Sequence, residues 1–340
     1  MKYIPLHKIN LNKIIRLDVT ITVKRKDGRI ERYYYPNRRL LRNGAIKIMC
    51  WLLKATSEYT NLQVVDINGN PRNIYDTWGH YYAYIHYGSG TKPWAYDDYK
   101  LDNQVGVIDY SDVSRTKIKD DSEGYGFRLS GSFTAGSSFT LAEVGLARNI
   151  LLYDTDYRVL FDRCVLDTPI PINAGDTVGI SYDIYYLYQG NGINRNGAIV
   201  IVSLWGETDT YDALTSIEGE TEKVRFFAGY GWDALGHWLI IALYSDFAWA
   251  YNLYQPSNYD EFESLSVTVL EDSSERLKCR IYKSLTAPSS RTYYGLGVCA
   301  GHTPLEVTYH HLLILQKFAS PKSVSAGDTI VPYVEVEYAY

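Results

Sequence analysis

The stretch "INAGDTVGISYDIYYLY", from Ile172 to Tyr188, has a second version, "SVSAGDTIVPYVEVEYAY", from Ser323 to Tyr340. Both contain Ala-Gly-Asp-Thr, at 174–177 and at 326–329, and in both an alternating, Tyr-rich run follows. Gly and Asp favour a turn, and alternation with a period of two is typical of a strand with one face on the core. The two stretches therefore predict the same element twice, a turn followed by a closing strand.

Two further pairs of similar blocks occur in the same order along the chain. "GAIKIMCWLLKA" (44–55) is similar to "GWDALGHWLIIA" (231–242), and "PWAYDDYKL" (93–101) is similar to "PSNYDEFESL" (256–265). Self-similarity in a constant order indicates an internal repeat. The sequence therefore predicts a tandem duplication in which the second copy has shorter connections.

The fold class that we predict is mainly β, with two tandem β-sandwich (jelly-roll-like) domains that each contain a short helix. Short strand-like runs separated by Gly, Asp, Asn or Pro are typical of such folds. The first domain, with an N-terminal hairpin, is expected to cover 1–190 and the duplicated second domain 191–340. The stretch "QGNGINRNG", 189–197, is predicted to link them, because Gly and Asn favour loops.

Two local elements are predicted near the start of the chain. Residues alternate on both sides of Asp27-Gly28, which predicts a hairpin with a type I′ turn. Pro36 is expected to end this hairpin. Apolar residues at i, i+3, i+4 and i+7 then predict a short amphipathic helix that begins at Asn43-Gly44.

Composition narrows the class of partner. The net charge is −5 and the pI about 5.8, which argues against general nucleic-acid binding, because such proteins carry a basic face. Tyr accounts for 33 of 340 residues, and its ring suits both half-buried strands and protein interfaces. One local cluster is basic, and it predicts either a solvated hairpin edge or a dock for an acidic partner: Lys24, Arg25, Lys26, Arg29, Arg32, Arg38, Arg39 and Arg42.

The expected location is inside the cell that makes the protein. The first residues lack an unbroken apolar segment, so no signal peptide is expected. No apolar run reaches the roughly 18 residues of a membrane span, so no membrane span is expected. Only two Met and five Gln occur, and scarcity of thermolabile residues is a feature of proteins from hot habitats.

We find no motif for catalysis or metal binding in the sequence. It lacks a Walker A loop, a GxSxG elbow and an HExxH helix. The cysteines at 50, 164, 279 and 299 lie far apart, which favours four separate thiols over two disulfides or a zinc site. We therefore expect no enzyme, no catalytic residue, no metal and no cofactor.

Acidic residues gather in three segments, 96–99, 119–124 and 258–264. We expect these segments to be solvated loops. A structural cation held by their oxygen atoms is a second possibility. A β-sandwich glycosidase is a third, and it would need two carboxylates that face one cleft.

The first copy carries a specific order of motifs: Asn-Gly before a helix, Gly-Ser-Gly-Thr after a strand, a Pro–Asp–Leu segment, Glu-Val-Gly-Leu, and an Arg before Ala-Gly-Asp-Thr. This order resembles a family of virion proteins of tailed phages and archaeal viruses. The matching residues are Asn43, Gly44, Gly88, Ser89, Gly90, Thr91, Pro93, Asp97 or Asp98, Leu101, Glu143, Val144, Gly145, Leu146, Arg163, Ala174, Gly175, Asp176 and Thr177. The resemblance implies a β-rich capsid, turret or tail subunit.

The function that we expect is therefore structural and non-enzymatic. The chain would assemble in the host cytoplasm into the virion, with copies of itself and other virion proteins as partners. Tyr commonly dominates subunit contacts, although each ring could equally cover its own sandwich. The interface candidates are Tyr182, Tyr185, Tyr186, Tyr188, Tyr333, Tyr338 and Tyr340.

The alternative is an adhesin that binds a carbohydrate or a receptor on a host surface. Exposed Trp rings in loops can stack on sugar rings, and acidic loops could hold a cation beside them. The candidates for such ligand contacts are Trp78, Trp94 and Trp249.

Overall fold

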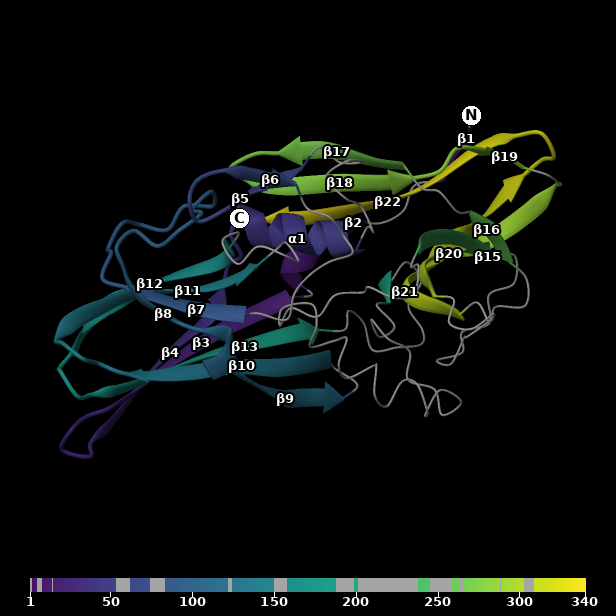
Figure 1. The fold of residues 1–340 in the computed structure, drawn as a ribbon. Helices are drawn as coiled ribbons and strands as arrows, with labels where there is room; N and C mark the ends of the chain where they lie inside the picture. The colour runs from purple at the N-terminus through teal and green to yellow at the C-terminus, as the bar shows by residue number, and fades with distance from the viewer. Residues whose placement is uncertain are drawn as a thin grey trace.

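A computed structural model gives the arrangement of the chain (Figure 1). It is mainly β, as the sequence predicts, and has a single α-helix among the residues that the structure describes. The described residues are 2–4, 8–13, 15–52, 62–73, 83–121, 124–149, 158–187, 199–200, 238–244, 259–262, 266–287, 289–302 and 309–340. The predicted linker at 189–197 lies outside them.

Two sheets are built mostly from the first half of the chain. One has the order β4-β3-β13-β10-β9 and the other the order β12-β11-β7-β8. The strands of the first sheet are β3 (Ile15–Lys24), β4 (Ile30–Arg38), β9 (Ser114–Asp121), β10 (Gly124–Thr134) and β13 (Thr177–Leu187). The strands of the second are β7 (Ala83–Gly88), β8 (Gln104–Ile108), β11 (Phe139–Asn149) and β12 (Arg158–Ile172).

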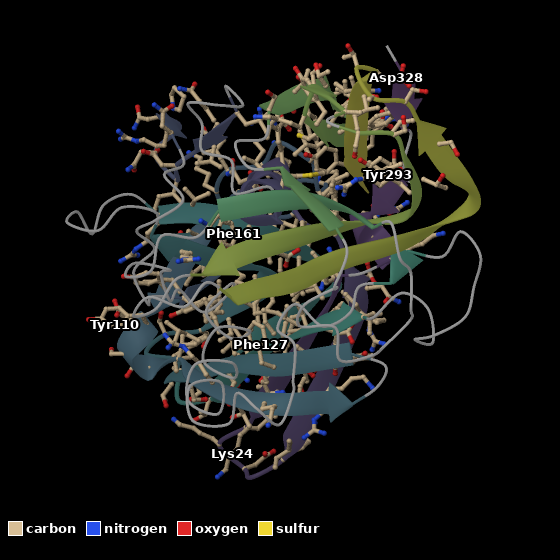
Figure 2. All side chains as sticks on the ribbon, turned by 90° about the vertical axis from the view of Figure 1, so that its right-hand side faces the viewer. Lys24, Tyr110, Phe127, Phe161, Tyr293 and Asp328 are labelled. Carbon is tan, nitrogen blue, oxygen red and sulfur yellow. The ribbon has the colours of Figure 1, made fainter. Side chains whose placement is uncertain are left out.

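These two sheets face each other across one apolar core. Alternate residues of β13 point inward, and Ile180 and Ile184 are fully buried, each worth about 1.5–3 kcal/mol relative to exposure. The rings of Tyr87 on β7 and Phe133 on β10 stack with their centroids 3.9 Å apart. Figure 2 shows Phe127 and Phe161 within this interior.

The second half of the chain forms two sheets with a matching strand order. β22-β18-β17 corresponds to β13-β10-β9, and β21-β20-β15-β16 corresponds to β12-β11-β7-β8. The strands are β14 (Ile199–Val200), β15 (Trp238–Tyr244), β16 (Tyr259–Phe262), β17 (Ser266–Asp272), β18 (Arg276–Tyr282), β19 (Leu285–Thr286), β20 (Arg291–His302), β21 (Tyr309–Val324) and β22 (Thr329–Ala339).

The first Ala-Gly-Asp-Thr forms the turn between β12 and β13. Gly175 has a φ of +89°, a conformation that favours glycine, and its N–H donates to the carbonyl of Ala135 at 2.7 Å. The buried Asp176 carboxylate accepts a hydrogen bond from the Asn173 N–H at 2.9 Å. It also accepts one from Arg25 Nη1 at 2.8 Å, which ties the turn to the hairpin.

The second Ala-Gly-Asp-Thr forms the turn between β21 and β22 with two of the same bonds. Gly327 has a φ of +84°, and its N–H donates to the carbonyl of Ala287 at 2.9 Å. The Asp328 carboxylate accepts from the Ser325 N–H at 2.8 Å. Each of these residues lies 152 positions after its counterpart in the first turn. The motif therefore occurs twice because the same turn is built twice.

The other two block pairings of the sequence are wrong. The similarity between 44–55 and 231–242 implies that the helix of the second domain lies at 231–242, but residues 238–244 form strand β15, and 231–237 lie outside the described residues. Trp-Leu-Ile runs suit a buried strand as well as a helix. The counterpart of β15 is β7, since Ala242 pairs with Gly297 as His86 pairs with Gly145.

The match between 93–101 and 256–265 fails for a similar reason. Residues 96–97 form a turn, whereas Tyr259–Phe262 form strand β16 beside β15. Shared Pro, Tyr and Asp are common in loops and strand ends, so their order alone does not place two segments in equivalent positions.

The beginning of the chain completes a sheet of the second half. β1 (Lys2–Ile4) and β2 (Lys8–Asn10) run parallel to β22 and pair with it. Both lie on the side of β22 that faces away from β18. In the first half, β3 has the equivalent position, on the side of β13 that faces away from β10. Beyond β2, the 3-10 helix η1 (Leu11–Lys13) leads into β3. The limits of the two predicted domains stay a prediction, but residues 2–4 and 8–10 pair outside the half in which we placed them.

The hairpin around Asp27-Gly28 exists, but its turn differs from the prediction. Only Gly28 has a positive φ, of +88°, whereas a type I′ turn needs two such residues. The Arg25 N–H donates to the carbonyl of Arg29 at 2.8 Å, so the loop has three residues. β4 also continues past Pro36 to Arg38, which an edge strand tolerates because its outer N–H groups need no partner.

Helix α1 (Arg42–Leu52) lies between the two halves in Figure 1. A Cβ on Gly44 would lie 2.7 Å from the carbonyl oxygen of Phe161, so glycine is needed for this close approach to β12. The Asn43 side chain exchanges two hydrogen bonds of 2.9 Å with the backbone of Val65. Val65 is in the small hairpin of β5 (Gln63–Val65) and β6 (Pro71–Asn73). Asn43-Gly44 therefore holds the helix against β12 on one side and against the β5–β6 hairpin on the other.

Candidate functional site

Several motif residues of the first copy, among them Gly90, Asp98 and Arg163, meet around the carboxylate of Glu143. Glu143 is on β11 and Arg163 is on the adjacent strand β12. Asp98 lies in the connection between β7 and β8, residues 89–103. We call Glu143, Arg163 and Asp98 the loop clamp.

Glu143 holds the connection through its backbone. Its Oε1 accepts hydrogen bonds from the N–H groups of Gly90 at 3.1 Å and Asn103 at 2.8 Å. Its Oε2 accepts one from the N–H of Asp102 at 3.1 Å. The carboxylate is fully buried, and a buried carboxylate needs such partners. Both ends of the connection are thus fixed to one side chain.

Arg163 joins Glu143 to Asp98. Its Nε donates to Glu143 Oε2 at 2.7 Å and its Nη1 to Asp98 Oδ2 at 2.7 Å. Its Nη2 donates to the carbonyl of Lys92 at 3.0 Å. Burial disfavours the charged guanidinium, but these hydrogen bonds outweigh burial and raise the pKa of Arg163. Arg suits this position because its planar group has donors in several directions.

The glycines of Gly-Ser-Gly-Thr are explained by the same carboxylate. A Cβ on Gly90 would lie 2.4 Å from Glu143 Oε1, and a Cβ on Gly88 would lie 2.4 Å from the carbonyl oxygen of Asn103. These distances are too short for any side chain. The motif is therefore a requirement of packing around Glu143.

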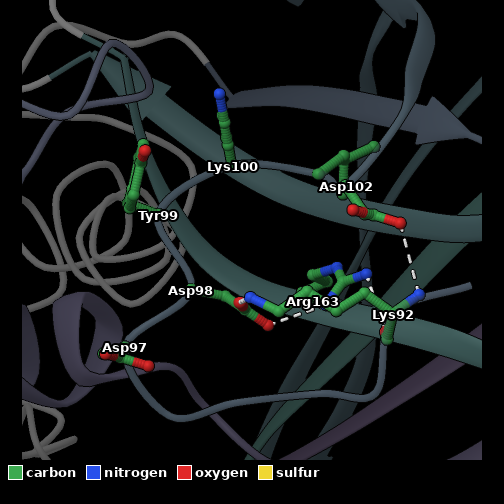
Figure 3. A pocket seen from close by; sticks show the side chains of 8 residues that line it. Lys92, Asp97, Asp98, Tyr99, Lys100, Asp102 and Arg163 are labelled. Atoms are coloured by element: carbon green, nitrogen blue, oxygen red, sulfur yellow. Dashed lines mark hydrogen bonds and ion pairs between the residues drawn. The ribbon is translucent and has the colours of Figure 1, made fainter. Parts of the chain in front are cut away.

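A polar pocket of about 190 Å³ lies above the loop clamp (Figure 3). Asp98 is buried, and its Oδ1 lies 3.3 Å from Lys92 Nζ. The expectation that segment 96–99 is a solvated loop is therefore wrong for this residue. The pocket is lined by Lys92, Asp97, Asp98, Tyr99, Lys100, Leu101, Asp102 and Arg163. Its buried charges, Arg163 and Asp98, pair with each other, so this part of its wall holds the connection in place.

The described residues contain no group of three or more His, Cys, Asp or Glu arranged to hold a metal ion. Cys164 and Cys279 are buried, and Cys164 is a free thiol. Burial raises the pKa of Cys164 to about 12, which leaves it protonated and a poor nucleophile at neutral pH. In the described part of the chain, no helix is long and apolar enough to cross a membrane.

The predicted interface tyrosines separate into two groups. Tyr182 and Tyr338 are buried in the core of this chain, so a second protein cannot reach their rings, and they are no longer interface candidates. Tyr185, Tyr333 and Tyr340 are half-buried. Arg16 lies 4.9 Å from the centroid of the Tyr185 ring and Arg280 lies 4.6 Å from that of Tyr333. The side chain of Tyr186 and the whole of Tyr188 lie outside what the structure describes.

Of the predicted ligand-contacting tryptophans, the structure describes Trp94 alone. Trp94 is half-buried and packs against a small cluster that includes Tyr84 and Leu160, which leaves less of its ring available to a sugar. Trp78 and Trp249 lie outside the described residues.

Sequence reasoning missed a buried polar group on β12. Asp162 is fully buried, and neither of its carboxylate oxygens has a hydrogen-bond partner among the described residues. Burial raises its pKa to about 7, and the nearby Arg38 and Tyr182 only partly oppose this rise. Its neighbour Cys164 is also buried. The sequence signal for this feature was a charged residue, Asp162, within the apolar run of β12.

A second missed feature is an ion pair that occurs in both halves. Arg128 on β10 forms two hydrogen bonds of 2.6 and 2.7 Å with Asp183 on β13. Arg280 on β18 forms two of 3.1 and 2.5 Å with Glu335 on β22. The paired positions differ by 152, so the constant offset could have revealed them.

Comparison with known proteins gives no match: no family model, no curated protein and no solved structure is significantly similar to this chain.

Proposed function

We propose that this chain is a non-enzymatic structural subunit of a virus particle, which acts by self-association. We further propose that it consists of two tandem β-sandwich (jelly-roll-like) units derived by duplication. Its partners would be copies of itself and other virion proteins, and it would assemble in the host cytoplasm. The order of motifs in the first copy and the repeated strand order of the second half support this proposal.

The observation that carries self-association is the position of the exposed apolar side chains. Among the described residues, four of the five large ones lie on β4, β8 and β17. Each of these strands pairs on one side only within the described sheets. An edge strand with apolar side chains is a template for pairing with another chain. The five residues are Ile30, Tyr34, Val105, Tyr110 and Leu270.

β4 is the strongest candidate among these edges. Ile30 is 63% exposed and Tyr34 54% exposed, on the same face of the strand. β4 also carries Arg32, which is exposed between these two residues on the same face. The opposite edge of that sheet, β9, carries Arg115, Lys117 and Lys119 and no exposed large apolar side chain among the described residues. Charges on an edge discourage pairing. Exposed apolar side chains therefore distinguish β4 from β9, which favours assembly through β4.

The test is the size of the purified protein as a function of concentration, measured by light scattering and electron microscopy. We expect the wild type to form regular oligomers. The double variant Ile30→Lys/Tyr34→Lys should stay monomeric, because charges on the edge oppose pairing. The Ile30 side chain is apolar, but the Tyr34 hydroxyl donates to Asp18 Oδ2 at 2.8 Å. We therefore expect a folded variant that has lost about 1 kcal/mol of stability.

The control is Thr116→Lys, an exposed position on the already charged edge β9, which should assemble like the wild type. A wild-type protein that stays monomeric at every concentration would contradict the proposal. Microscopy of virus particles that contain the chain would then assign it to a shell, a spike or a tail.

A further inference from the structure

A groove of about 350 Å³ lies on the outer face of the sheet β22-β18-β17. This volume is at the lower end of the range for small-ligand sites, roughly 300–1,000 Å³. It is lined by Thr268, Leu270, Arg280, Tyr282, Ser284, Val331 and Tyr333. The groove is far in the sequence from the loop clamp and shares no residue with it.

Aromatic and aliphatic groups form the floor of the groove. Tyr282 on β18 and Tyr333 on β22 are directly opposite each other in the register, so their half-buried rings lie side by side on one face. Leu270 on β17 is 39% exposed. The hydroxyl groups of Thr268 and Ser284, both exposed, lie along the same groove. The lining therefore alternates between flat apolar surface and hydroxyl groups.

Arg280 fixes the orientation of the Tyr333 ring. Its guanidinium lies 4.6 Å from the ring centroid and is held by Glu335 through two hydrogen bonds. Glu335 also lies 2.7 Å from Lys278 Nζ, and Lys278 faces Glu337 in the register. The positive charges of Arg280 and Lys278 are therefore matched by the negative charges of Glu335 and Glu337 on this part of the sheet. The groove has no excess charge that would favour an ionic ligand.

The first half of the chain offers an internal comparison for this groove. The ion pair of Arg280 has its counterpart in Arg128 and Asp183, at the same positions of the equivalent strands. The two tyrosines do not: the residues 152 positions before Tyr282 and Tyr333 are Ser130 and Ser181. The ion pair is therefore part of the shared scaffold, whereas the pair of rings is specific to the second half.

We propose that this groove is a binding site for a neutral saccharide. The C–H faces of a sugar ring can cover an aromatic ring, and its hydroxyl groups need donors and acceptors at the edges. Tyr282 and Tyr333 supply the flat surface, Thr268 and Ser284 supply hydroxyl groups, and Arg280 supplies N–H donors held in place by Glu335. This activity goes beyond the proposed structural role and does not depend on it.

The experiment begins with an array of neutral and sialylated glycans, followed by calorimetric titration of the best neutral glycan. We expect Tyr333→Ala and Tyr282→Ala each to weaken binding by about tenfold or more, as is usual when a central aromatic contact is removed. Tyr333→Phe, which keeps the ring, should bind within about threefold of the wild type. The melting temperature of each variant shows whether it has kept its fold.

The matched control is Tyr185→Ala. Tyr185 is also a half-buried ring stacked with an arginine, on the equivalent outer face of the first half. Its removal should leave glycan binding unchanged. Binding of sialylated glycans only, no binding of any glycan, or equal binding by wild type and Tyr333→Ala would each overturn the proposal. None of these outcomes bears on the oligomeric state, so this site and the structural function are tested separately.

Discussion

Buried charged side chains in this core differ in whether they have hydrogen-bond partners. Arg163 and Glu143 are both fully buried and pair with each other, whereas Asp162, the residue before Arg163, has no hydrogen-bond partner among the described residues. Desolvation is offset by hydrogen bonds in the first case and not in the second. Successive residues of β12 point to opposite faces of the strand, which is why neighbours differ so much.

The variant Asp162→Asn tests the cost of this carboxyl group. Its pKa is about 7 in the folded chain and about 3.8 otherwise. Because the folded state keeps the proton, the contribution of this carboxyl group to the free energy of unfolding is fully present below about pH 4. It is lost as the pH rises to about 7. The loss is at most about 4 kcal/mol, since one pKa unit corresponds to about 1.4 kcal/mol. We expect the variant to lose less stability than the wild type between pH 5 and pH 8.

The measurement is the free energy of unfolding in urea at several pH values. Asp97→Asn is the control, because Asp97 is exposed and its replacement should leave the pH dependence as in the wild type. Parallel pH curves for wild type and Asp162→Asn would show that Asp162 is ionised in the folded protein. Arg38, Tyr182, Cys164 and Tyr338 are the titratable groups coupled to it, and all four remain in the variant.

Among the described elements, the connection between β7 and β8 has three backbone N–H groups that donate to a single side chain, Glu143. Glu143→Gln removes the negative charge beside Arg163 and weakens the acceptor for three backbone N–H groups. Breaking a buried ion pair in this way typically costs about 3–5 kcal/mol. We expect a loss of that size, together with faster hydrogen exchange of the amides in residues 89–103.

The control for this variant is Asp183→Asn. It breaks the pair with Arg128, whose side chain is 44% exposed, so the expected loss is only about 0–1 kcal/mol. If both variants lost equal stability, or if exchange in 89–103 stayed unchanged in Glu143→Gln, the loop clamp would not be what holds this connection.

The elements show what the sequence could and could not predict. The hairpin at Asp27-Gly28 and the repeated turns were predictable, because their signals are local: turn residues and strict alternation. The turn type and the extension of β4 past Pro36 were not, since an edge position tolerates residues that a central strand would exclude. The helix that the block similarity implies is wrong for residues 238–242, which lie in β15, because a short apolar run fits two kinds of element.

The candidate site was predictable only as a set of residues. Glu143, Arg163, Asp98 and the glycines were recognisable as a motif, but their meaning depends on contacts between segments 20 to 65 positions apart. Sequence patterns report the periodicity of one element at a time. For the same reason the pair of Tyr282 and Tyr333, which are adjacent only through strand register, could not be found in the sequence.

At the scale of the whole molecule, the two halves share contacts that are not part of either repeat. The buried Tyr338 hydroxyl accepts a hydrogen bond from the Leu40 N–H at 2.7 Å. Arg42 on α1 forms hydrogen bonds of 2.9 and 2.6 Å with Asp272 on β17. The apolar core also continues from one half into the other. These contacts indicate that the described parts of the two halves unfold together.

Tyr338→Phe tests this coupling. It removes the acceptor of a buried N–H, which typically costs about 1–3 kcal/mol. We expect one unfolding transition in urea for the wild type, followed by both fluorescence and circular dichroism, and one transition at lower urea for the variant. Tyr282→Phe, whose hydroxyl lies in the exposed groove, should shift the midpoint little. Two separate transitions in the wild type would show that the halves are independent.

The pairing of β1 and β2 with β22 also sets an order for the production of the protein. The side chain of Asn12 exchanges two hydrogen bonds with the backbone of Ala339, 327 positions away. During translation, the first strands leave the ribosome long before their partner has been made. A nascent chain must therefore carry these strands unpaired until residues 329–339 emerge. A product cut short before that point would lack the partner for its own first strands, and chaperones and proteases could distinguish it from a finished chain.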